Sequence, residues 1–515
     1  MHNTLTDPVI RIVAADRDEH VTLPGLYAAL MTDQVRSVTA LRPHQRHALH
    51  AFLVQVGALA LLAADTTTLT DSGDVWRDLL RGLTREFPSD EPWTLVVGDL
   101  SKPALLQPPV PEATLDALKI ETTPDSIDML ATARNHELKV ARMSSAEMEP
   151  DSWLYALLTL QTCEGWGGRN NYGISRMNSG SGSRPAVGLA PKGGWGARVR
   201  RDISRLIAKR GDVLADFPIY RQAGGIALVW LEPWNGVTQI TSEQLDPYYV
   251  EVCRRIRLVA AESGAILARR GGSTATRIAK VAAGVTGDPW APIKKQDGFK
   301  LLTITGSGWD YSCVAKILDP EKFKAAPLQV WEPDDGIDVS LVMMGMARGN
   351  STTDGYHERV VPIPPRLVSL FGGKTDRLGT ACRERVQQAS RMRLKVLKPA
   401  LYKLAQAAPA KIDFDKSQSQ KSADPILKAF DREVDRTFFT ALFDELAETG
   451  DAARAQRQTW VQQMYAVAEL MLRQAEASAP MPQARRHKII AAGREQLAAA
   501  YHATFPTNGD ADADL

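Results

Sequence analysis

The stretch DPILKAFDREVDRTFFTALFDELAETG, residues 424–450, decides the fold of the C-terminal part of the chain. Asp424-Pro425 is a helix-start signal, because proline fits the first turn of a helix, where its missing N–H is not needed. The apolar residues after it recur at spacings of three and four, and they are Leu427, Phe430, Val434, Phe438, Leu442 and Leu446. Such spacing places them on one helix face, and Gly450 ends the pattern. The stretch therefore predicts one long amphipathic helix.

Three more helical segments surround this one. Asp451 can cap a following helix, whose apolar face carries Trp460, Met464, Val467 and Met471. Pro480 and Pro482 separate it from a last helix with Ile489, Ile490, Leu497 and Tyr501, and a basic helix is expected at residues 375–408. Short connections favour antiparallel neighbours, so residues 366–515 are predicted to form a four-helix bundle. Residues 412–423, which contain SQSQKS, are expected to be a mobile polar loop, and GDADADL a solvated tail.

The part before the bundle mixes short strands with helices. Strands are predicted at residues 9–14, 226–230, 248–252, 298–305, 339–346 and 359–363, and helices at 47–63, 153–160, 198–208 and 311–318. Because strands and helices follow no regular alternation, residues 1–365 are expected to form an irregular mixed domain. The predicted fold class is therefore α+β, a mixed N-terminal domain followed by a four-helix bundle.

Composition limits the classes of function. The chain has 515 residues and a net charge of +2, from 62 basic and 60 acidic residues, so attraction to a polyanion must come from local patches. No apolar run reaches the ~20 residues of a membrane span, and the N-terminus lacks the layout of a signal peptide. We expect a cytoplasmic protein without membrane contact. No P-loop, H-E-x-x-H or G-x-S-x-G motif is present, so we expect no enzyme activity and no cofactor.

Metal binding is also not expected. The four cysteines lie far apart without a C-x-x-C pair, which predicts reduced and mostly buried thiols. His44, His47 and His50 recur every third residue, but arginines and no carboxylates lie beside them. We therefore interpret them as part of a solvated helix face.

The most informative stretch for function is residues 164–210. It carries ten basic residues against the two acids Glu164 and Asp202, together with many glycines. Glycines allow positive φ and close approach of the backbone to a ligand, and guanidinium groups match phosphate oxygens. We expect a nucleic acid as the partner, with phosphate contacts from Arg198, Arg200, Arg201 and Arg205. The alternative is a flexible solvated loop.

Two further segments carry candidate contacts. In RIAKVAAGVTGDPWAP, Lys280 stands ten residues before Trp290 with turn residues between them, so it can project into a groove. In LVMMGMARGNSTTDGYHERVVPIP, two strands flank a tip at Arg348, Gly349, Asn350, Ser351 and Thr352. Small polar side chains at such a tip suit insertion between base pairs, although a plain turn is the alternative. The basic run at residues 383–398 is either a solvated helix face or a further nucleic-acid contact.

Taken in order, these segments resemble the CasA family, the large subunits of type I-E CRISPR Cascade complexes. The likeness rests on VTLPGLYAAL at residues 21–30, EGWGGRNNYGISR at 164–176, the lysine followed by W-x-P, GSGWD at 306–310, MGMARGN at 344–350 and the closing bundle. It implies a non-catalytic subunit of a crRNA-guided complex. Such a subunit recognises the protospacer-adjacent motif of double-stranded DNA from the minor groove, helps to open the duplex and meets a helicase-nuclease.

The resemblance also assigns residues. It implies a glycine loop at Gly165, Trp166, Gly167 and Gly168 with Arg169 beside it, a lysine finger at Lys280, and a wedge at Asn350, Ser351 and Thr352. Ser351 stands where the family's wedge has a glutamine, so its reach between bases is shorter. The paired cysteines with which some relatives bind zinc are missing here.

Two rival interpretations remain open. One is a generic nucleic-acid-binding scaffold subunit of another ribonucleoprotein complex, which would not need to open a duplex. The other is a nuclease that uses Asp334, Asp335 and Asp338, although WEPDDGID is more typical of an acidic turn.

Overall fold

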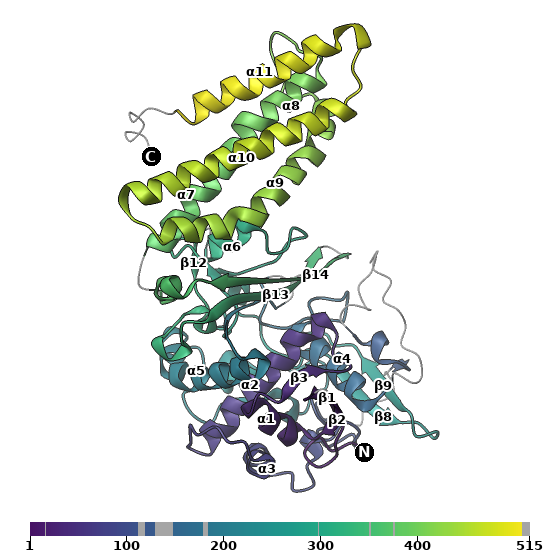
Figure 1. Cartoon of the computed structure of the whole chain (residues 1–515). Helices are drawn as coiled ribbons and strands as arrows, with labels where there is room; N and C mark the ends of the chain where they lie inside the picture. The colour runs from purple at the N-terminus through teal and green to yellow at the C-terminus, as the bar shows by residue number, and fades with distance from the viewer. Residues whose placement is uncertain are drawn as a thin grey trace. The chain divides into compact units, whose positions relative to one another are not determined.

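The chain forms two compact units, and each is described by itself (Figure 1). The computed structural model describes residues 1–15, 17–111, 119–128, 148–178, 184–296, 298–349, 352–373 and 376–506. The mixed unit comprises Met1–Trp309 and Lys322–Gly373, and the helical unit comprises Asp310–Glu321 and Lys374–Leu515. The helical unit is therefore built from two separate parts of the chain, residues 310–321 and the residues from 374 onward. The sequence analysis placed residues 310–321 in the mixed domain.

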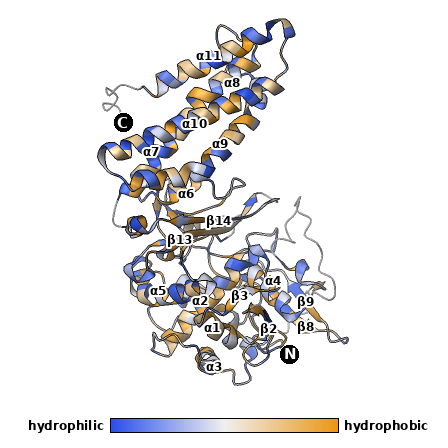
Figure 2. Ribbon diagram, in the orientation of Figure 1, coloured by the Kyte–Doolittle hydropathy of each residue, from blue (hydrophilic) through white to orange (hydrophobic). Residues whose placement is uncertain are grey.

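The helical unit is a four-helix bundle, as predicted. Its elements are α7 (Arg377–Arg391), a π-helical turn (Met392–Leu397), α8 (Lys398–Ala405), α9 (Ser417–Leu446), α10 (Gly450–Ser478), a 3-10 turn (Gln483–Arg485) and α11 (Arg486–Thr504). The segment from α7 to α8 is continuous and forms one side, with α9 against α10 and α8 against α11. The helices carry apolar and polar bands along their length (Figure 2). The short helix α6 (Tyr311–Ile317) packs on α7 and α9, with the Tyr311 and Phe438 rings 5.0 Å apart.

The start of α9 corrects two predictions. The helix begins at Ser417, eight residues before Pro425, so SQSQKS forms helical turns instead of a mobile loop. Pro425 lies inside the helix, although its nitrogen has no hydrogen to donate to the carbonyl four residues earlier. Ser419 and Ala423 are buried, and Ser419 Oγ accepts a hydrogen bond from Gln406 Nε2. Tertiary packing thus extends a helix through a segment that its composition assigns to a loop.

The mixed unit contains small sheets instead of one continuous sheet. β1 (Ile10–Ala14), β2 (Arg17–Val21) and β3 (Val35–Val38) form an antiparallel sheet in the order β2-β1-β3. β4 (Lys119–Glu121), β9 (Ile266–Gly271) and β8 (Arg255–Ala260) form another, in that order. The longest hairpin pairs β13 (Val339–Gly349) with β14 (Thr352–Ile363), and β5 (Ala186–Pro191) adds to β13. This confirms the predicted irregular α+β class.

The remaining strands are short. β6 (Ile226–Leu228) and β7 (Leu245–Val250) form a parallel pair. β10 (Ile293–Lys294) lies between β11 (Lys300–Leu301) and β12 (Phe323–Lys324). The strand expected at residues 298–305 is therefore reduced to two residues. The helices of this unit are α1 (Leu23–Met31), α2 (Arg46–Ala63), α3 (Gly73–Gly82), α4 (Pro150–Cys163) and α5 (Gly194–Asp216).

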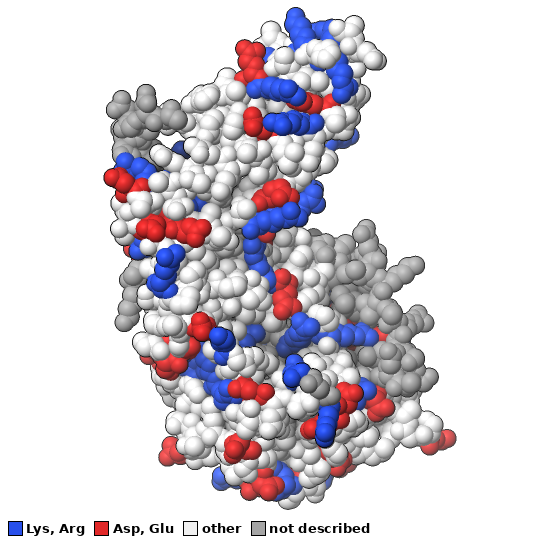
Figure 3. Space-filling model, in the orientation of Figure 1, with Lys and Arg blue, Asp and Glu red and all other residues white. Residues whose placement is uncertain are grey.

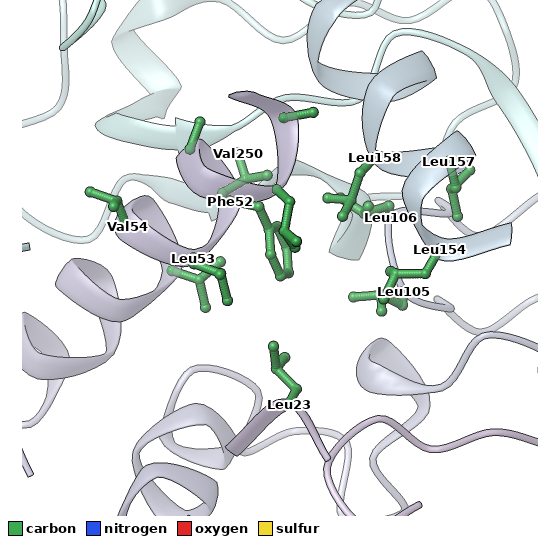
Figure 4. Packing of buried hydrophobic residues seen from close by; sticks show 14 of the residues in the cluster. Leu23, Phe52, Leu53, Val54, Leu105, Leu106, Leu154, Leu157, Leu158 and Val250 are labelled. Atoms are coloured by element: carbon green, nitrogen blue, oxygen red, sulfur yellow. The ribbon is translucent and has the colours of Figure 1, made fainter. Parts of the chain in front are cut away.

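The core of the mixed unit is built around α2 and α4. Figure 4 shows Phe52, Leu53 and Val54 of α2 close to Val250 of β7, with Leu105 and Leu106 beside Leu154, Leu157 and Leu158 of α4. Almost every residue of α2 is buried, because other elements cover the helix on all sides. Within the described residues, Pro43–Ala63 alone is long and apolar enough to cross a membrane, and here it is a mostly buried core segment.

The three histidines at the start of this core segment are buried, which corrects the solvated face expected from the sequence. His44 Nε2 lies 2.8 Å from Asp128 Oδ1, and His50 Nε2 lies 2.8 Å from Asp202 Oδ2. Desolvation and the nearby charge of Arg198 lower the pKa of His50 to about 4. The carboxylate partners stand 84 and 152 residues further along the chain, where no local pattern reveals them.

Candidate nucleic-acid interface

The glycine loop, defined here as residues 164–173, is a tight turn after the end of α4. The Gly167 N–H donates to the Asn171 carbonyl at 2.8 Å, and the Asn171 N–H donates back to the Gly168 carbonyl at 3.0 Å. Gly168 has φ +113°, a backbone conformation that side chains with a Cβ rarely adopt, and Asn170 has φ +65°. The local sequence accounts for this turn, because glycine and asparagine are the residues that tolerate positive φ.

The loop is held from one side by arginines that the sequence analysis did not single out. Arg254 is buried, and its Nη2 donates to the Gly165 carbonyl at 2.7 Å. Arg270 of β9 donates to Asn171 Oδ1 at 3.1 Å. Arg254 directly precedes β8 in RRIRLV, and Arg270 lies in β9 in ARRGG, so arginines beside apolar strand residues were the available signal. Hydrogen bonds from Arg254 and Arg270 therefore hold the loop in place where it faces the rest of the mixed unit.

The other side of the loop faces solvent. Trp166 is 45% exposed, and Arg169 is exposed as well. A Cβ built on Gly168 meets no atom within 4 Å, whereas one on Gly173 would lie 2.5 Å from the Gly165 carbonyl carbon. Gly173 is therefore needed for packing within the loop. Gly168 is needed for its φ and leaves open space beside the backbone.

The chain after the loop is anchored in the core next to β7. The Ser175 N–H donates to Glu251 Oε1 at 2.5 Å, and the Ser175 and Tyr249 hydroxyls lie 2.7 Å apart. Arg176 stacks over the Tyr249 ring at 3.9 Å from its centre. Burial raises the pKa of Glu251 to about 7. This polar cluster fixes the loop's second end.

Lys280 is exposed, and the chain around it lies against the segment that follows the glycine loop. A Cβ on Gly284 would lie 2.3 Å from the Met177 carbonyl oxygen, so the two backbones touch. Further along, Asp288 is buried between Arg184 and Arg176, with Oδ2 2.6 Å from Arg184 Nε and 3.5 Å from Arg176 Nη1. Two stretches that the sequence analysis treated separately are therefore neighbours in space.

The β13–β14 hairpin meets the glycine loop directly. Arg348, near the end of β13, forms an ion pair with Glu164 at the start of the loop, 184 residues away. The register of the hairpin shifts between Ala347 and Arg348, and Gly349 pairs with Thr352. Asn350 and Ser351 lie outside the described residues, so their predicted wedge role stays a prediction.

Three of the four arginines expected to contact phosphates are turned inward, which corrects that expectation. Arg201 Nε lies 2.7 Å from Asp335 Oδ1, and Arg205 binds Asp334, Asp335 and Glu332. Arg198 is buried with Nε 3.8 Å from Asp202 Oδ2. Arg200 forms a bidentate pair with Asp33, with oxygen distances of 3.0 and 2.5 Å. These guanidinium groups already have acidic partners within the chain.

The acids of WEPDDGID provide most of those partners. Asp334 and the buried Asp335 lie in a 3-10 turn, Pro333–Asp335, which Glu332 directly precedes. Asp338 follows the turn and lies 3.6 Å from Lys192. The acidic-turn interpretation of this segment thus agrees with its geometry. Across the parts of the chain that the structure describes, no three His, Cys, Asp or Glu side chains are placed to hold a metal ion.

The basic run of the first bundle helix is also largely engaged. Arg385 is buried, donates to Glu445 Oε2 at 2.8 Å and stacks over Trp460 at 4.6 Å from the ring centre. Arg383 and Arg393 pair with Asp319 and Asp431. On the face shown in Figure 3, basic and acidic side chains are interspersed over both units. On this face, a polyanion would therefore meet local basic contacts and not a uniformly basic surface.

Comparison with known proteins identifies the fold. No protein-family model and no curated protein matches the sequence. Among solved structures, Thermus thermophilus CasA (Cse1) matches with a TM-score of 0.65 at 15% identity, over 97% of this chain and 99% of that chain. Thermobifida fusca Cse1 matches with a TM-score of 0.63 at 16% identity, over 98% of each chain. A chain of a CRISPR RNA-guided surveillance complex matches with a TM-score of 0.57 at 12% identity, over 96% of this chain and 99% of that one.

Proposed function

We propose that the chain is the non-catalytic, CasA-like large subunit of a type I-E CRISPR RNA-guided surveillance complex. In this role it recognises the protospacer-adjacent motif of double-stranded DNA, aids opening of the duplex and recruits a helicase-nuclease. The nearly full-length likeness in fold supports the assignment. The observation that carries it is that the β13–β14 hairpin contacts the glycine loop through Arg348 and Glu164, while Gly284, four residues after Lys280, lies against Met177, four residues after the loop.

The proposed contacts follow from what is exposed there. The supported backbone at Gly167 and Gly168 can approach a minor groove, because no side chain lies between it and solvent at Gly168. Lys280 adds a point charge, and Arg169 and Trp166 lie beside the turn. A minor groove distinguishes mainly A·T from G·C pairs, so this set would read a short and degenerate motif. The guide RNA would supply the remaining sequence specificity by base pairing.

The proposal assigns Trp166, Gly167, Gly168, Arg169, Lys280, Asn350, Ser351 and Thr352 to the DNA contact. Gly165 is left out because it is buried and its carbonyl is bound by Arg254. Arg198, Arg201 and Arg205 are left out because they are buried in ion pairs. No catalytic residue is assigned, since Asp335 of the rival nuclease site is bound by two arginines. The partners are target DNA and the crRNA-containing subunits, and the place of action is the cytoplasm.

The test is to reconstitute the complex around a guide RNA and select from duplexes that match the guide but carry randomised flanking bases. The expected result is enrichment of a short motif on one side of the target. Omission of this chain should remove the enrichment. Binding that needs the chain but shows no preference among flanks would favour the scaffold alternative, and divalent-metal-dependent cleavage by the purified chain would favour the nuclease.

A further inference from the structure

We propose that the Glu164–Arg348 ion pair is a positioning device that makes the glycine loop and the β13–β14 hairpin act as one unit. Motif recognition by the loop would thereby be coupled to opening of the duplex by the hairpin. Arg348, which the sequence predicted to contact DNA, would then act through Glu164. This inference rests on the proposed function and adds to it a link between its two steps.

The pair is buried at the junction of the two elements. The side chains of Arg348 and Glu164 are 10% and 2% exposed, and Arg348 Nη1 contacts Glu164 Oε1. Glu164 directly precedes Gly165, and Arg348 directly precedes the last described residue of β13. The hairpin register shifts at this point, because Ala347 pairs with Gly355 whereas Arg348 pairs with Thr353. The ion pair therefore lies at the point where the regular pairing of the hairpin is interrupted.

Glu164 is the first residue of the glycine loop and also helps to hold the two ends of the loop together. Its carbonyl accepts the Ile174 N–H at 3.0 Å, which closes the loop at its base. Its second carboxylate oxygen, Oε2, is buried and has no hydrogen-bond partner in the described part of the chain. Arg254 and Arg270, the nearby arginines, are directed at Gly165 and Asn171. The carboxylate therefore depends on Arg348 for its charge-assisted contact.

A buried ion pair of this kind favours one relative placement of its two elements. Separating the partners would leave a buried charge without compensation, which is strongly unfavourable. Any DNA contact that stabilises the loop in its position then also stabilises the hairpin in its position, and the reverse holds by thermodynamic linkage. The hairpin would be placed for opening when the loop has engaged its motif.

The experiment uses the assembled complex with Glu164→Gln, Arg348→Gln and the double variant. Opening is followed by 2-aminopurine fluorescence at the first base pairs beside the motif, on a closed duplex and on one with a pre-opened bubble there. Each single variant is expected to slow opening of the closed duplex about tenfold, a typical coupling between contacting residues. The double variant should be no slower than the singles, and the bubble substrate should be bound as by the wild type.

Two controls distinguish a specific role of the Glu164–Arg348 pair in positioning the hairpin from a general loss of stability. Arg348→Lys keeps the charge and should recover most of the opening rate. Arg210→Gln breaks another partly buried pair of the mixed unit, with Asp246, whose side chains are 20% and 9% exposed. It should leave opening unchanged. If the Gln variants do not fold, the exchanged pair Glu164→Arg with Arg348→Glu should restore assembly and part of the opening rate.

Additive losses in the double variant, equal losses on the bubble substrate, or an equal effect of Arg210→Gln would overturn the inference. An exchanged pair that assembles but does not recover opening would overturn it as well. Failure of the proposed function looks different, because the wild-type complex itself would then show no preference for a flanking motif.

Discussion

Arg201 of α5 and Asp335 of the 3-10 turn Pro333–Asp335 form an ion pair of 2.7 Å, and their side chains are 5% and 1% exposed. The two residues are 134 positions apart in the sequence. Arg205 adds a second contact to the same carboxylate at 2.9 Å. The basic helix α5 is thus tied to an acidic turn of the mixed unit, and this pairing gives the helix a structural role.

Asp335→Ala is expected to lower the free energy of unfolding by about 3–5 kcal/mol, because it leaves buried guanidinium charge without its partner. Asp334→Ala is the matched control. Its side chain is 75% exposed although it also contacts Arg205, so its loss should cost less than about 1 kcal/mol. Urea unfolding of the full chain measures both, and equal losses would contradict the buried pair.

The same carboxylate gives a pH dependence. Burial raises the pKa of Asp335, but the hydrogen bond and charge of Arg201 outweigh burial and hold it below the ordinary value of 3.8. A lowered folded-state pKa contributes stability that is fully present above 3.8 and is lost as the pH falls through the folded-state value. When the pH is lowered from neutral to below 3.8, the free energy of unfolding should therefore fall more for the wild type than for Asp335→Asn. Parallel pH profiles would contradict the lowered pKa.

Gly168→Asp is expected to fold, assemble and lose motif-dependent binding at least tenfold, because a carboxylate would occupy the open space beside the loop backbone and repel DNA. The positive φ should cost about 1–2 kcal/mol of stability. Gly224→Asp is the matched control, since Gly224 also has positive φ and open space around it but lies outside the loop. A Gly168→Asp complex that still selects its motif would refute the assignment of the loop.

Lys280→Ala should weaken binding of the closed target duplex by ~1–3 kcal/mol, the range of one good base-edge contact. Lys280 is exposed, so the substitution should leave the melting temperature unchanged. Binding of a pre-opened, single-stranded target should also stay unchanged. Competition binding with both substrates measures the effect, and equal losses on the two would show that Lys280 does not read the duplex.

Arg254→Met should make the glycine loop more mobile, because Arg254 holds the start of the loop at Gly165. It removes the donor to the Gly165 carbonyl and should cost about 1–3 kcal/mol of stability, the penalty for an unsatisfied buried acceptor. Hydrogen exchange at the Gly167 and Asn171 amides, which close the turn, should accelerate more than exchange in α2. Uniform acceleration throughout the mixed unit would mean that Arg254 supports the core in general and not the loop.

Much of the fold was predictable because it depends on local periodicity. The spacing of Phe430, Val434 and Phe438 marks a buried helix face, and these residues are buried in α9. The alternation on both sides of Arg348 predicted the β13–β14 hairpin. The helix start was misplaced at Pro425, because burial of Ser419 and Ala423 extends α9 toward its N-terminus. Composition alone does not report such packing.

The sequence by itself determined the elements and the turn of the candidate site, since the period of apolar residues and the positive φ of Gly168 are properties of short stretches. The tertiary structure decided which charged residues are available to a ligand. Arg201 and Arg169 lie in the same basic stretch, yet one is buried against Asp335 and the other is exposed. The reason is physical. A charge is neutralised by whatever lies within a few ångströms of it, and for Arg201 and Arg348 those partners are 134 and 184 residues away along the chain.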